Sequence, residues 1–165
     1  MLLAVALAEL YAGKLDLDNL KECIPEVRVK GRFQVMGKGP LVVADASHNP
    51  EGISRFAANV YRYFKGKKKI IIFAVLKDKD YRTMVREIIK VADTLILTSS
   101  NNQRSLDIDS LESETLKIMK NSHIKIGQIY KIDNIENSLN FALNIADSND
   151  IICIIGSITN LEHVV

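Results

Sequence analysis

Short apolar runs alternate with amphipathic stretches along most of this chain, and this alternation constrains the fold more than any other feature. Residues 50–64 place apolar side chains at helical spacing, whereas residues 70–75 are continuously apolar, as in a strand covered on both faces. Strands and helices that alternate in this way form a mainly parallel sheet with helices on its faces. We therefore predict a doubly wound α/β domain over residues 31–165. The expected strands are 32–36, 41–44, 70–75, 94–98, 128–132 and 151–155, and the expected helices are 50–64, 84–92, 109–120, 134–147 and a short one at 157–164.

The first 30 residues follow a different pattern. Residues 2–11 and 16–24 predict two short helices, which end at Gly13 and Pro25. The apolar run at the start has no basic residue before it and is interrupted by Glu9, so it does not resemble a signal peptide. It is also far shorter than the roughly 20 residues that a membrane span needs. We expect residues 1–30 to be a helical tail whose apolar side packs on another segment.

Charge and cysteine content narrow the class of protein. The chain has 22 Lys and Arg against 20 Asp and Glu, a net charge of +2, which argues against a dedicated nucleic-acid-binding protein. Cys23 and Cys153 lie far apart, so neither a disulfide scaffold nor a cysteine metal cluster is expected, and a reduced, cytoplasmic setting fits best. Because Cys153 lies inside an apolar strand, we expect it to be a small buried side chain.

The segment from Asp45 to Pro50 is the richest in chemistry-bearing residues. Asp45 ends a predicted buried strand, so it lies where α/β domains bind their ligands. Asn49 and Pro50 are typical of a helix start, which places His48 beside backbone N–H groups that attract anions. One interpretation makes Asp45 and His48 ligand-binding residues. The other makes Asp45 a turn cap and His48 an ordinary loop residue.

Further candidates follow other strands. Arg32 offers a planar cation for phosphate or for stacking on a purine, but it also fits a surface arginine. In residues 77–80 the lysines are candidates for a phosphate and the aspartates for helix caps, and Arg104 is a cation at the same predicted edge. Gly156 permits close backbone approach, and Ser157 is either a helix cap or a site residue.

Several common site motifs are absent from the sequence. No G-x-x-x-x-G-K-[ST] phosphate loop and no G-x-G-x-x-G dinucleotide fingerprint occur. No His, Cys and carboxylate cluster has metal-ligand spacing, and no G-x-S-x-G nucleophile elbow is present. The residues alone therefore indicate a ligand-binding domain without a complete catalytic apparatus.

Four blocks of the chain together resemble one known family. They are residues 31–35 (GRFQV), 45–50 (DASHNP), 75–80 (VLKDKD) and 156–157 (GS). This combination is similar to the C-terminal, Rossmann-like domain of folylpolyglutamate synthase, which in bacteria is often also dihydrofolate synthase and belongs to the Mur ligase superfamily. The resemblance runs over the whole chain, and residues 1–30 are similar to the helical end of the family's central ATPase domain.

The resemblance implies an ATP-dependent amide ligation. In the family, ATP phosphorylates a carboxylate of the folate or dihydropteroate substrate, L-glutamate attacks the acyl phosphate through its amine, and phosphate leaves. The family uses Mg²⁺ to neutralise phosphate charge, and its phosphate loop and metal ligands belong to the central domain. The resemblance thus implies ATP, L-glutamate and folate or dihydropteroate as partners of the full-length enzyme, with no nucleic acid or membrane. It also implies that the isolated chain is inactive.

The same resemblance assigns roles to individual residues. Arg32 and Asp45 match ATP-binding positions of the family, and His48 matches the motif histidine in the interdomain cleft, near the glutamate or the reacting phosphate. Ser157 falls in the block near the amino-acid site. The chain departs from the family at Ala46-Ser47, where Gly-Ala is usual, and at Gln103, where many relatives have proline before the arginine.

A different class of function is compatible with the same residues. The chain would then be a stand-alone, non-catalytic module that binds a nucleotide or a protein partner through the same crevice. This hypothesis predicts measurable binding by the isolated chain that Asp45→Ala abolishes. The ligase hypothesis predicts weak adenine-nucleotide affinity and negligible turnover for the isolated chain, because it requires a second domain that brings the phosphate loop.

Overall fold

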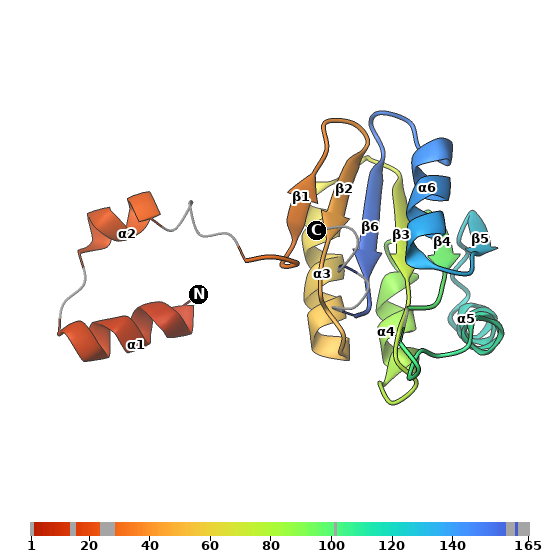
Figure 1. The fold of residues 1–165 in the computed structure, drawn as a ribbon, viewed down its shortest axis with the longest axis horizontal. Coiled ribbons are helices and arrows are strands. Elements are labelled where there is room, and N and C mark those ends of the chain that lie inside the picture. Colours follow the sequence, from red (N-terminus) through yellow and green to blue (C-terminus); the bar gives the residue numbers. More distant parts are fainter. Residues whose placement is uncertain (1, 14–15, 24–28, 101, 158–160, 162–165) are drawn as a thin grey trace.

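A computed structural model describes residues 2–13, 16–23, 29–100, 102–157 and 161. Six strands form one sheet in the order β1-β2-β6-β3-β4-β5 (Figure 1). All neighbouring strands are parallel except β1 and β2, which are antiparallel. The strands are β1 Gln34–Met36, β2 Leu41–Ala44, β3 Lys69–Phe73, β4 Thr94–Leu97, β5 Gln128–Lys131 and β6 Ile151–Ile155. The predicted doubly wound α/β class is confirmed.

The sheet is covered by helices on both faces (Figure 1). Side chains alternate along β6: Cys153 and Ile155 join the core beneath α3, α4 and α5, whereas Ile152 and Ile154 join the core beneath α6. The last strand is therefore apolar throughout because both of its faces are buried. The helices are α3 Pro50–Tyr63, α4 Tyr81–Ile88, α5 Ile108–Ser122 and α6 Ile135–Ile145.

Some predicted boundaries differ from the structure. Strand β1 begins at Gln34 rather than at residue 32, because Gly31 and Phe33 have φ of +64° and +46°, outside the extended range. Helix α4 begins at Tyr81, directly after its cap Asp80, and ends at Ile88 rather than at 92. The expected helix at 157–164 falls mostly outside the described residues.

The N-terminal helices α1, Leu2–Ala12, and α2, Leu17–Cys23, lie apart from the sheet (Figure 1). Apolar side chains of α1 stand in solvent: Leu10 is 82% exposed and Tyr11 is 96% exposed. The helix is apolar apart from Glu9, and a helix of this composition is normally buried. The helices expected in this region are thus present, and α1 has unburied apolar surface.

The centre of the sheet depends on Gly156, which follows β6. Its φ is +106°, and a Cβ built there would lie 2.1 Å from the carbonyl oxygen of Ala74 and 2.8 Å from the Phe73 ring. The Gly156 N–H donates to the Ser47 carbonyl at 3.0 Å, so this glycine also joins β6 to the loop after β2. Only glycine combines this backbone conformation with this close approach.

Replacing Gly156 tests this packing. Gly156→Ala is expected to lower the free energy of unfolding by about 3 kcal/mol, because overpacking and a strained φ act together. The matched control is Gly66→Ala, where φ is +77° but nothing lies within 4 Å of the new Cβ. The control should cost only the backbone strain, about 1 kcal/mol. Urea unfolding followed by circular dichroism measures both, and equal losses would contradict the packing argument.

Candidate functional site

The loop after β2 is organised by the Asp45 carboxylate. One carboxylate oxygen, Oδ2, accepts a hydrogen bond from the Phe33 N–H at 2.7 Å. The other, Oδ1, accepts from the Ser47 N–H at 2.8 Å and from the Ser47 hydroxyl. Asp45 is 7% exposed, so its charge is stabilised by these three donors rather than by bulk water. A carboxylate accepts about four hydrogen bonds, which leaves Oδ2 able to accept one more.

His48 lies at the exposed end of the same loop. Its ring Nδ1 is 2.9 Å from the Ala46 carbonyl oxygen. Because a carbonyl oxygen only accepts, this contact places a hydrogen on Nδ1, and in the neutral ring Nε2 is then a hydrogen-bond acceptor. The φ of Ala46 is not positive, so alanine fits without backbone strain at a position where the family usually has glycine.

The loop ends at the start of α3. Asn49 caps the helix, its side chain accepting from the Gly52 N–H at 2.8 Å, and Pro50 occupies the first turn. This confirms the helix start predicted from the sequence. The N-terminal end of this 14-residue helix carries partial positive charge that favours anions.

Arg32 and His48 share a hollow of about 210 Å³ at this helix start. Ser47, Asn49, Glu51, Gly52 and Arg55 line the rest of it. Arg55 forms an ion pair of 2.7 Å with Glu51, whereas Arg32 makes no ion pair with any described residue. An exposed guanidinium, a histidine and a helix N-terminus thus converge, and this arrangement can hold an anion such as a phosphate.

The remaining candidates divide between this region and the next loops. Ser157 is 4% exposed and directly follows Gly156, which is bonded to the Asp45 loop. Asp80 caps α4, accepting from the Thr83 N–H at 3.2 Å. Hydrogen bonds from the Thr83 side chain and then from its backbone N–H hold the pKa of Asp80 below its usual value. Arg104 binds Asp78 and lowers the pKa of that carboxyl. Arg104 is therefore engaged in an ion pair that links the loops after β3 and β4.

Cys153 behaves as the sequence predicts. Its side chain is fully buried in β6, and burial raises the pKa of the thiol far above its usual range. A protonated, inaccessible thiol is unreactive. Cys153 is therefore a packing residue.

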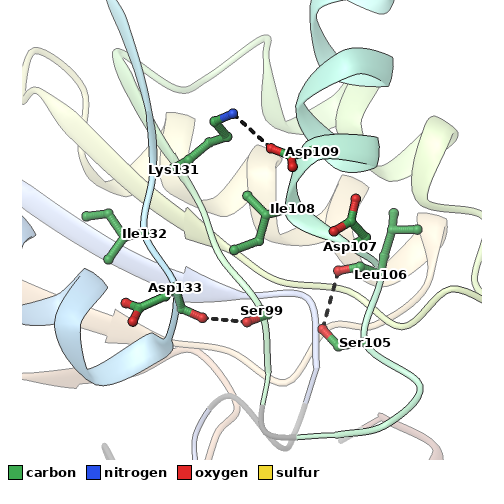
Figure 2. A pocket seen from close by; sticks show the side chains of 9 residues that line it. All are labelled: Ser99, Ser105, Leu106, Asp107, Ile108, Asp109, Lys131, Ile132 and Asp133. Carbon is green, nitrogen blue, oxygen red and sulfur yellow. Dashed lines mark hydrogen bonds and ion pairs between the residues drawn. The ribbon is translucent and has the colours of Figure 1, made fainter.

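A second hollow, of about 390 Å³, lies at the carboxyl ends of β4 and β5, and sequence reasoning missed it (Figure 2). Lys131 lines this hollow and forms ion pairs with Asp109 and Glu112, each at 2.9 Å. Its hydrogen bonds to Glu112 and then to Asp109 raise the pKa of this lysine. Asp107 caps α5 through the Ser110 N–H at 2.9 Å. Polar residues directly after the predicted strands were the available signal, but their mutual pairing is visible only in three dimensions.

Neither a metal-ion cluster nor a membrane-spanning helix occurs in the part of the chain that the structure describes. Residues 2–13, 16–23, 29–100, 102–157 and 161 contain no group of three or more His, Cys, Asp or Glu side chains arranged to hold a metal ion. None of the helices within those ranges is long and apolar enough to cross a membrane.

A mainly parallel sheet with an anion-accepting loop at its carboxyl edge defines a ligand-binding α/β domain. The chain belongs to the Mur ligase family: residues 31–158 match the family's glutamate ligase domain. The resemblance to folylpolyglutamate synthases is confirmed by relatives that carry that name.

Three of the similar proteins show the range of relatives. The dihydrofolate synthase/folylpolyglutamate synthase of Mycobacterium tuberculosis is 31% identical over 114 residues, covering 66% of this chain and 23% of the relative. The UDP-N-acetylmuramoyl-L-alanyl-D-glutamate–2,6-diaminopimelate ligase of Buchnera aphidicola is 33% identical, covering 94% of this chain and 30% of the relative. The solved structure of M. tuberculosis folylpolyglutamate synthase with ADP is 24% identical and superimposes with a TM-score of 0.84, covering 96% of this chain and 36% of the other.

These similarities concern only part of each relative. The chain spans between about a quarter and a third of the length of the curated folate synthases that it matches. The structural likeness at 24% identity shows the shared fold.

Substitution of Asp45 tests its role in the loop. Asp45→Asn replaces one carboxylate oxygen by an amide NH₂, which faces an N–H donor of Phe33 or Ser47 and leaves that donor unpaired. The expected loss is about 1–3 kcal/mol in the free energy of unfolding. Asp147→Asn, the same change at an exposed carboxylate between α6 and β6, is the control and should change it by less than about 0.5 kcal/mol. Chemical denaturation measures both, and an unchanged denaturation midpoint for Asp45→Asn would contradict the role of Asp45 in holding the loop.

Proposed function

We propose that this chain is the C-terminal part of an ATP-dependent ligase that joins L-glutamate to folate or dihydropteroate. The observation that carries the proposal is the hollow in which Arg32 and His48 meet the N-terminus of α3, beside Asp45. Membership of the Mur ligase family and relatives named as folate synthases support it. In this proposal the chain forms one wall of an active site that is completed by another domain.

The proposed roles of the residues follow from their chemistry. Arg32 binds a phosphate or stacks on the adenine of ATP, because its guanidinium is exposed in the hollow and makes no ion pair with a described residue. Asp45 accepts a hydrogen bond from a ribose hydroxyl through the remaining capacity of Oδ2. That carboxylate is already held by the loop, so it would bind with little loss of conformational entropy.

His48 and Ser157 are proposed on the acceptor side of the reaction. In the proposed chemistry, a substrate carboxylate takes the terminal phosphoryl group of ATP and forms an acyl phosphate. The amine of L-glutamate then attacks the acyl carbon, an amide bond forms and phosphate leaves. His48 is proposed as the catalytic residue, since its Nε2 is available to the reacting phosphate or amine. Ser157 is a candidate for the glutamate site because the Gly156 backbone joins it to the Asp45 loop.

Mg²⁺ accompanies ATP in this proposal, but the described residues form no group that fits a metal ion. Its ligands would therefore come from the rest of the enzyme. The buried thiol of Cys153 is compatible with the proposed cytoplasmic setting.

The ligase can be tested by joining this chain to the sequence encoded before it. The longer protein is expected to form an amide-linked glutamate product from ATP, L-glutamate and a folate or dihydropteroate acceptor, detected by mass spectrometry. Arg32→Ala should raise the KM for ATP by about tenfold or more, the cost of one hydrogen bond to a charged group. Lys125→Ala, an exposed lysine between α5 and β5, is the control and should leave KM unchanged.

The outcome separates the alternatives. A product only with UDP-N-acetylmuramoyl-L-alanyl-D-glutamate as the carboxylate substrate and diaminopimelate as the amine would favour the other class of relative. An upstream sequence without a phosphate loop would contradict the ligase and leave the stand-alone binding module. The exposed apolar side chains of α1 favour the ligase, because such a surface is expected to pack on a further part of the protein.

We propose that residues 1–30 form the end of the preceding domain and residues 31–165 the ligase domain itself. Leu10→Glu is then expected to leave the melting temperature of this chain unchanged, because Leu10 is already in solvent. In the longer protein the same change should lower the melting temperature, since it would place a charge in an apolar contact. Differential scanning calorimetry of both proteins measures this, and an equal response in the two would argue against the boundary.

A further inference from the structure

Phe33 has a backbone conformation that is costly for its side chain. Its φ is +46°, in the left-handed region, where a bulky residue other than glycine is rare. Such a conformation costs on the order of 1–2 kcal/mol for an L-residue. It persists only where surrounding contacts outweigh that cost, and positions of this kind cluster at functional sites.

The contacts that hold Phe33 come from its ring. The ring centroid is 5.8 Å from that of Phe56, 6.1 Å from that of Tyr63 and 6.1 Å from that of Phe64, all on or directly after α3. Aromatic pairs of this geometry contribute roughly 0.5–1.5 kcal/mol each beyond the area they bury. Three such pairs are enough to offset the backbone strain, so the aromatic cluster determines the conformation of residue 33.

That conformation places two groups of the candidate site. The Phe33 N–H points to Asp45 and donates to Oδ2 at 2.7 Å. Arg32 lies between two left-handed residues, Gly31 and Phe33, and this tight turn brings its side chain to the hollow beside His48. The Gly31 carbonyl accepts from the Ala46 N–H at 2.7 Å, which joins the turn to the loop from its other side.

We propose that Phe33 is a positioning residue of the nucleotide site, acting through Arg32 and Asp45. The packing of its ring on α3 sets where the guanidinium and the carboxylate lie, although the ring itself lies outside the hollow. The inference rests on the proposed function, in which the hollow takes the nucleotide. It adds that the affinity of the hollow is governed by the aromatic cluster behind it.

The test compares single-residue variants of this 165-residue chain. Phe33→Leu removes the ring contacts, and Phe64→Leu removes the stacked partner while leaving residue 33 unchanged. The control is Phe141→Leu, on α6 and on the opposite face of the sheet. It removes an aromatic ring whose centroid lies 4.7 Å from that of Tyr130 on β5. Melting temperatures establish that each variant is folded, and NMR titration with ADP measures binding.

Phe33→Leu is expected to weaken ADP binding by roughly tenfold, within the range of couplings seen between contacting residues. Phe64→Leu should act in the same direction with a smaller effect, and Phe141→Leu should leave binding unchanged. In an Arg32→Ala background, Phe33→Leu should cost less than in the wild-type chain, because part of its effect is exerted through Arg32. A full additional loss in that background, or an equal loss in Phe141→Leu, would overturn the proposal.

Amide hydrogen exchange tests the positioning independently of binding. The amide of residue 33 should be protected in the wild-type chain and in Phe141→Leu, and exchange at least several-fold faster in Phe33→Leu and Phe64→Leu. Unchanged protection in both ring variants would overturn the proposal. A wild-type chain that gives no response to ADP would count against nucleotide binding by the isolated chain, while this comparison would still decide the role of Phe33.

Discussion

The position of β6 is the constraint on which the rest of the structure depends. The last strand in the chain lies between β2 and β3, pairs with both in parallel, and is buried on both faces. This arrangement requires Gly156, because any side chain there would collide with the Ala74 carbonyl. It also brings the loop after β2 beside the loop after β6, and the Gly156 N–H bonds the two together. Residues more than 100 positions apart in sequence therefore meet at one edge of the sheet.

Asp45 has a structural role at that edge and, in the proposed function, a binding role as well. Its carboxylate holds the loop by accepting from Phe33 and Ser47, and the same bonds fix its position before any ligand binds. Groups that are held before the ligand arrives bind with less entropic cost. The Ser47 hydroxyl adds a donor that the alanine usual in the family lacks, so this departure from the family pattern adds a hydrogen bond between Asp45 and its loop.

The site residues differ in how far the sequence revealed them. Asp45 and His48 are predicted as candidates because a buried strand followed by a helix-capping Asn-Pro places them at the edge where α/β sheets bind ligands. Arg32 was found as a cation of suitable chemistry, but its place depends on the left-handed turn at 31–33. That turn is held by aromatic rings of α3, so no local pattern around Arg32 predicts it. Arg104 was also a candidate cation for the ligand edge, but in the structure it is engaged in an ion pair with Asp78. This pair joins two separate loops, so the spacing of residues in the sequence does not predict it.

The sequence by itself determined the fold class, the order of strands and helices along the chain, and the helix cap at Asn49, because these follow from hydrophobic periodicity and local hydrogen bonding. The sequence offered both Asp78 and Asp80 as caps of the helix that follows them, and the structure selects Asp80. Only the tertiary structure decided the antiparallel start of the sheet, the inward orientation of the Asp45 carboxylate and the hollow shared by Arg32 and His48. The physical reason is the range of the interactions. Periodicity and capping act between residues a few positions apart. The candidate site is assembled by contacts between distant segments, which meet only after β6 pairs with β2 and β3.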